Sequence, residues 1–200
     1  MSKRNTIILC SVFFAGAILT GLYKLGVFKN PSEAYNHRGY AKDVKGDYNG
    51  AIADFNQAIA FKPNYAEAYY NRGLAKGHKR DYDGAIADYT QAIALKPNYP
   101  KAYNHRGVSK FCKADFAGAI ADFTQAHALM PNNADYYNHR GEAKAHKGDY
   151  DGAIADFTQA LALKPNFGEF YRNLCDAKKA KGDYDGTNAD YGQAHALKSK

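Results

Sequence analysis

Apolar and polar residues follow a helical period through most of the chain. In the stretch 66–99, Tyr69 and Gly73 lie at helical spacing, and Ala85, Tyr89 and Ala92 do so further on. Lys-Arg-Asp-Tyr separates the two patterns, and Lys-Pro-Asn ends the second, because proline cannot continue a helix. The pattern therefore predicts two helices, over about 66–78 and 83–95, joined by a short turn.

This helix pair recurs every 34 residues. Four residue types carry the period: Tyr35, Tyr69, Tyr103, Tyr137 and Tyr171; Gly39, Gly73, Gly107 and Gly141; Ala51, Ala85, Ala119 and Ala153; Pro63, Pro97, Pro131 and Pro165. The units are 32–65, 66–99, 100–133, 134–167 and 168–200, and they account for everything after residue 31. The sequence predicts an all-α array of five repeats.

Small residues predict how the two helices of a repeat pack. Glycine at repeat position 8 and alanine at position 20 have little or no side chain, so the helices can approach closely there. Aromatic residues at positions 4 and 24 fill the space on either side. Most glycines fall at positions 8, 15 and 19, so we interpret them as part of the repeat and not as a phosphate-binding loop.

The repeat strongly resembles the tetratricopeptide repeat. The family pattern at positions 4, 8, 11, 20, 24, 27 and 32 is met in the second unit by Tyr69, Gly73, Lys76, Ala85, Tyr89, Ala92 and Pro97, with lysine replacing an aromatic at position 11. Segments such as AIADF and KPN are similar to those of bacterial members. The resemblance implies a right-handed superhelical solenoid of helix-turn-helix repeats whose first helices line a concave groove.

Lysine at position 11 occurs in every unit, and arginine stands one turn earlier in four of them. Aspartate recurs at position 23 on the second helix. We expect this acid to face the basic pair, while the long basic stems pack as apolar filler. The alternative interpretation is a basic ladder that binds a ligand.

The first 31 residues form a separate segment. Residues 6–23 are 18 positions without a charge, which as a helix spans about 27 Å, enough to cross the hydrocarbon core of a bilayer. Two interpretations compete: an uncleaved membrane anchor, and a secretory signal with Ala15-Gly16-Ala17 as its cleavage motif. Flanking positive charge favours the repeats inside, whereas the signal-like start favours an extracytoplasmic location.

Charge argues against nucleic acid as the partner. The formal net charge is +7, but four basic residues and no acids lie in positions 1–31, so the remainder carries 23 − 20 = +3. Such a weak excess does not provide the phosphate-binding surface that nucleic-acid proteins need.

Side chains for catalysis are not gathered in any recognisable motif. The seven histidines recur at equivalent repeat positions and so lie on different units, too far apart to share a metal. Cys10, Cys112 and Cys175 have no metal-binding spacing. We therefore expect no enzyme activity, no cofactor and no metal site.

The concave side of the first helices is the predicted partner-binding groove. In the family, positions 5, 6 and 9 tend to face it. Asparagine and histidine there both donate and accept hydrogen bonds, which suits the backbone of an extended peptide. The candidate residues are Asn36, His37, Tyr40, Tyr70, Asn71, Leu74, Asn104, His105, Val108, Asn138, His139, Arg172 and Asn173.

The sequence thus predicts a non-enzymatic scaffold that binds a protein or peptide partner in this groove, tethered to or exported across a membrane. One alternative is a groove that binds nothing. Another is a membrane-anchored structural spacer in which association between copies is the function.

Overall fold

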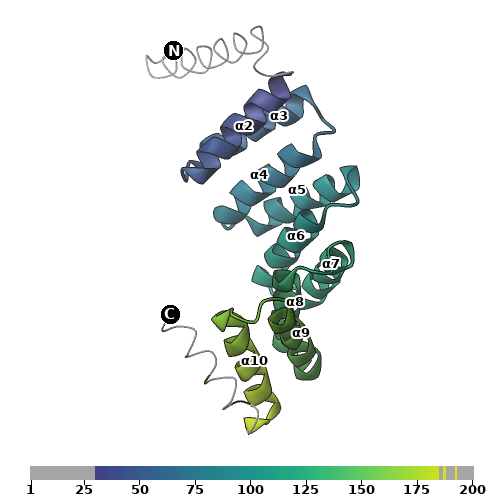
Figure 1. The fold of residues 1–200 in the computed structure, drawn as a ribbon. Coiled ribbons are helices and arrows are strands. Elements are labelled where there is room, and N and C mark those ends of the chain that lie inside the picture. The colour runs from purple at the N-terminus through teal and green to yellow at the C-terminus, as the bar shows by residue number, and fades with distance from the viewer. Residues whose placement is uncertain (1–29, 185–186, 188–191, 193–200) are drawn as a thin grey trace. The chain divides into compact units, whose positions relative to one another are not determined.

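The structure is a computed structural model that describes residues 30–184, 187 and 192. This part of the chain forms nine helices and no strand (Figure 1), which confirms the all-α prediction. The helices are α2 (Pro31–Val44), α3 (Tyr48–Phe61), α4 (Ala66–His78), α5 (Tyr82–Leu95), α6 (Pro100–Cys112), α7 (Phe116–Leu129), α8 (Ala134–His146), α9 (Tyr150–Leu163) and α10 (Gly168–Lys181). Even-numbered helices are the first helices of the predicted repeats. Odd-numbered helices are the second ones.

The chain divides into two compact units, residues 1–95 and 96–200. In the first unit α2 packs on α3, α3 on α4, and α4 on α5. In the second unit α6 packs on α7, α7 on α8, α8 on α9, and α9 on α10. Each unit is therefore built from consecutive packed helices, as the 34-residue period predicts.

The predicted membrane segment, residues 6–23, lies outside the described residues, as does most of the predicted last helix. Among the helices between residues 30 and 184, none is both long and apolar enough to cross a bilayer.

In the first four repeats the aromatic ring at position 24 forms the core. Phe55, Phe123 and Phe157 are at most 1 % exposed. The glycine at position 8 faces this ring directly: a Cβ added to Gly107 would lie 2.7 Å from Cε1 of Phe123. The close approach predicted at this glycine is confirmed, and the ring of the second helix occupies the space that a side chain would need.

The next repeat covers the other side of the ring with a small residue at position 10. Ala75 packs against Phe55 and Ala51 of the preceding repeat. In the second unit Ala143 does the same for Phe123. Phe55 and Phe123 are thus each buried by the first helix of their own repeat and by the first helix of the following one.

Aspartate at position 16 begins the second helix of a repeat. The carboxylate of Asp47 accepts a hydrogen bond of 2.9 Å from the backbone N–H of Gly50, which satisfies a donor that the first turn leaves unpaired. Asp81, Asp115 and Asp149 make the same bond to the glycine three residues later. The Asp-x-x-Gly spacing therefore fixes where each second helix starts.

A left-handed residue at position 15 precedes this cap, and it gives a first prediction. Glycine occupies the position at 46, 148 and 182, whereas Ala114 adopts φ 61° with a side chain. Ala114→Gly should raise the free energy of unfolding by about 0.5–1 kcal/mol, because a Cβ is strained in this conformation. Urea unfolding followed by circular dichroism measures the change. Ala121→Gly, in the middle of α7, is the control and should lose about 1 kcal/mol. A loss in both variants would contradict the prediction.

Candidate functional site

The first helices of consecutive repeats lie against each other within each unit. Contacts join α2 to α4 in the first unit, and α6 to α8 and α8 to α10 in the second. We call the surface that they form within each unit the first-helix face and define it by repeat positions 5, 6, 9, 12 and 13. All thirteen candidate residues predicted from the sequence lie on these helices.

In three repeats the asparagine at position 5 is buried between neighbouring first helices. Asn36, Asn104 and Asn138 are 7 %, 7 % and 4 % exposed. Each pairs with position 6 of the following repeat within the same unit: Asn71 donates to Asn36 at 3.0 Å, Nδ1 of His139 lies 2.9 Å from Oδ1 of Asn104, and Asn173 donates to Asn138 at 2.9 Å. These side chains bond to each other and so connect the repeats.

Tyr70 occupies the same position in the second repeat and is buried as well. Its ring lies 5.9 Å from that of Tyr89, so it extends the core of that repeat. From the sequence, the side chains at positions 5 and 6 were all predicted to face a partner. The sequence could not reveal that most of them contact a neighbouring helix.

Exposed side chains of the first-helix face include those at positions 6, 9 and 13 of the first repeat and at position 5 of the last repeat. Tyr40 is 56 % exposed and Val44, one turn later, is 68 % exposed. His37 and Arg172 are also exposed, and Leu74, Val108 and His105 are half-buried. Val44 was not among the predicted residues. Its place one helical turn beyond Tyr40 is the signal that could have identified it.

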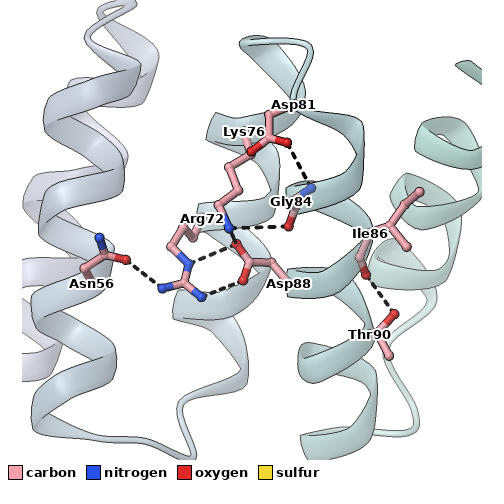
Figure 2. A network of polar contacts seen from close by, with 8 residues as sticks. All are labelled: Asn56, Arg72, Lys76, Asp81, Gly84, Ile86, Asp88 and Thr90. Atoms are coloured by element: carbon pink, nitrogen blue, oxygen red, sulfur yellow. Dashed lines mark hydrogen bonds and ion pairs between the residues drawn. The ribbon is translucent and has the colours of Figure 1, made fainter. Parts of the chain in front are cut away.

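The basic residues at positions 7 and 11 are held by the aspartate at position 23 (Figure 2). Arg72 donates two hydrogen bonds to Asp88, of 2.9 and 2.6 Å, and Nζ of Lys76 lies 2.8 Å from the same carboxylate. Lys76 also donates to the carbonyl oxygen of Gly84 at 3.4 Å, and Arg72 donates to Asn56 of the preceding repeat at 2.6 Å.

The same arrangement recurs at Arg38, Lys42 and Asp54; at Arg106, Lys110 and Asp122; and at Arg140, Lys144 and Asp156. The four aspartates are 3 % exposed. The hydrogen bond to Asp156 raises the pKa of Arg140 above its usual value. The predicted structural role of the basic pair is thus confirmed in four repeats, and these cations do not form a separate ligand-binding ladder.

Three stretches of the chain match family models. The model described as "Tetratricopeptide repeat" matches residues 66–99 and 134–167, which are the second and fourth predicted repeats. The model described as "TPR repeat" matches residues 44–77. The chain is a tetratricopeptide-repeat protein.

Solved structures with this fold include several of MamA. Two of them, titled "Crystal structure of MamA" and "Crystal structure of MamA protein", are each 25 % identical to this tetratricopeptide-repeat protein, with TM-scores of 0.77 and 0.78. The first covers 80 % of this chain and 94 % of MamA, and the second 84 % and 92 %. A MamA from Desulfovibrio magneticus RS-1 is 18 % identical with a TM-score of 0.80, covering 84 % and 95 %. No curated protein matches the sequence.

The tetratricopeptide repeats and the MamA-like fold support a protein–protein interaction scaffold. Within the described residues, no group of three or more histidine, cysteine, aspartate or glutamate side chains could hold a metal ion. Cys112 is exposed and Cys175 is buried, and within the described residues neither forms a disulfide.

The pairing of His139 with Asn104 gives a second prediction. Burial lowers the pKa of His139 below its usual value, although nearby Glu142 opposes the shift. The unfolded chain therefore takes up a proton first, and stability should fall as the pH drops below about 6.5. We expect His139→Asn to reduce this loss between about pH 7.5 and about pH 5, measured by urea midpoints.

Asparagine suits this position in the tetratricopeptide-repeat protein, because Asn71 and Asn173 make the equivalent bond in other repeats. The control is His78→Asn, since His78 is an exposed histidine on a first helix. An equal loss of stability in the parent and in His139→Asn would contradict the prediction.

Proposed function

We propose that the protein binds a segment of a partner protein on its first-helix face. The observation that carries the proposal is the exposed apolar pair on α2. Among the first helices that the structure describes, α2 carries exposed large apolar side chains, Tyr40 and Val44, one turn apart. Contiguous apolar surface that is exposed to solvent is common at interaction sites.

The chemistry beside this pair suits a polypeptide. His37 is exposed one turn before Tyr40 on the same helix and carries groups that both donate and accept hydrogen bonds. Leu74 lies on the neighbouring α4 at the same repeat position as Tyr40 and adds apolar surface. The paired side chains at positions 5 and 6 do not contact the partner in this proposal. They hold consecutive first helices of a unit in register and so fix the spacing of the exposed groups.

Photo-crosslinking tests the proposal. Benzoylphenylalanine placed at position 40 of the full chain, in the native cells, is expected to capture a distinct protein. The control is the same residue at position 61, because Phe61 is also aromatic and also 56 % exposed but lies at the end of the second helix α3. Capture at 40 and not at 61 would support the proposal.

Two other outcomes would overturn it. Equal capture of the same proteins at both positions would remove the link to the first-helix face. Cross-links only to other copies of the chain would favour the spacer, in which association between copies is the function.

We also propose that residues 6–23 attach the protein to a membrane. The support is the sequence itself: 18 uncharged residues preceded by Lys3 and Arg4. Fractionation of cells expressing the full chain should place it in the membrane pellet after washing with alkaline carbonate. Release of the whole population into the supernatant would contradict attachment.

A further inference from the structure

A cavity of about 250 Å³ opens on the first-helix face of the second unit. It lies where α8, α9 and α10 meet. Its apolar lining includes Ala145, Ala177, Ala180, Tyr150 and Phe157. Pockets for drug-sized ligands are usually larger, about 300–1,000 Å³, so the size suits a single side chain.

The cavity exists because the two positions whose rings fill the preceding interface, between α6 and α8, are occupied by alanine here. Between α6 and α8 the same place holds Phe111, Phe116 and His146, whose ring centroids lie 5.0 to 5.4 Å apart. One repeat later, Ala145 stands at the position of Phe111 and Ala180 at the position of His146. Among the described residues that line the cavity, no side chain takes the place of the two missing rings.

At repeat position 9, the rim of the cavity differs in charge from the preceding repeats. Position 9 is apolar in the first three repeats, as Tyr40, Leu74 and Val108, but it is Glu142 and Asp176 in the two repeats that border the cavity. The interface between α8 and α10 therefore holds an open cavity with an acidic rim, whereas the equivalent space between α6 and α8 is filled by aromatic rings.

The two carboxylates are available to a cation. Glu142 is fixed by amide groups: Asn138 and Asn173 each donate to its Oε1 at 2.8 Å. Asp176 is exposed. Two lysines near the cavity in sequence are engaged elsewhere, Lys144 with Asp156 and Lys181 with Asp151.

We propose that this cavity receives one arginine or lysine side chain of the partner segment. The inference rests on the proposed function and names the chemistry of one anchor. The aliphatic stem would lie against the alanines and Tyr150, and the cationic group would reach Glu142 and Asp176 at the rim. A long basic side chain combines these two parts, and charge-assisted bonds to carboxylates are the strong ones.

A pair of small peptides tests the proposal on the full chain. Acetyl-Gly-Arg-Gly-amide is compared with the same peptide containing citrulline, which keeps the shape of arginine and lacks its charge. Saturation-transfer NMR gives both dissociation constants. We expect the citrulline peptide to bind about tenfold more weakly.

Variants locate the binding. Glu142→Gln with Asp176→Asn should weaken arginine binding about tenfold, because both carboxylate charges are lost while glutamine keeps the acceptor that Asn138 and Asn173 use. Ala145→Phe keeps both charges and restores the residue found at Phe111, so it should abolish binding by filling the cavity. Glu67→Gln removes an exposed charge from α4 and should leave the constant within about twofold.

Three results would overturn the proposal: equal binding of the two peptides, binding retained in Ala145→Phe, or equal weakening by Glu67→Gln. An oligomeric parent that becomes monomeric in the double variant would also overturn it, by assigning the cavity to a basic side chain of a second copy. Failure here leaves the cross-linking at position 40 unaffected, so the two proposals are tested separately.

Discussion

Gly73→Val is expected to lower the free energy of unfolding by about 3 kcal/mol. Gly73 lies in the middle of α4, and a Cβ at this residue would come within 2.7 Å of Cε1 of Tyr89. The ring cannot move away easily, because it is only 2 % exposed. A valine must therefore force the two helices of the repeat apart.

Gly77 on the same helix provides the matched control. Its Cβ would meet only the hydroxyl of Tyr89, at 3.9 Å, which is ordinary contact distance. Gly77→Val should therefore change the free energy of unfolding by less than about 1 kcal/mol, since both variants share the small gain in helix propensity. Urea unfolding of the two variants measures the difference. Equal losses would mean that the space at Gly73 is not what matters.

Arg72→Met is expected to cost about 2–3 kcal/mol, the second large effect. Asp88 is 3 % exposed, so removing the guanidinium leaves a buried carboxylate with Lys76 as its remaining cation. Methionine retains most of the apolar stem, so the variant measures the loss of the guanidinium with its two hydrogen bonds to Asp88 and its one to Asn56. Thermal and urea unfolding both measure the change.

Two further variants separate this explanation from a general loss of charge. Arg172→Met removes an exposed arginine from α10 and should change stability by less than about 0.5 kcal/mol. Replacing Arg72 and Lys76 by methionine together with Asp88→Leu should recover most of the loss, because no buried charge is then left unpaired. A triple variant no more stable than Arg72→Met would contradict this account of the network.

Much of the fold follows from the sequence because the repeat constrains each position several times over. The ion pairs are the clearest case. Arg72, Lys76 and Asp88 were expected to meet because their spacing recurs in other repeats, and helical geometry places positions 7 and 11 on one side of the first helix. The glycine at position 8 was predictable for the same reason.

The binding surface could not be predicted as well, because it depends on contacts between repeats. The distance between α2 and α4 decides whether Asn36 is exposed to solvent or hydrogen-bonded to Asn71, and no local sequence pattern specifies that distance. The cavity has a similar origin. Ala145 and Ala180 are 35 residues apart, and neither alanine by itself indicates a cavity. The space appears only when both are small at the same interface.

The burial of Phe55 and Phe123 by the repeat that follows them also restricts how such a chain can change in length. A duplicated segment of 34 residues brings one ring such as Phe55 and one covering residue such as Ala75, so the added ring is covered in the same way. A segment of another length would leave a ring facing water or a first helix with no ring beneath it. Gene duplication can therefore lengthen or shorten this protein in whole repeats at little cost to the folded state, while smaller insertions are confined to the turns.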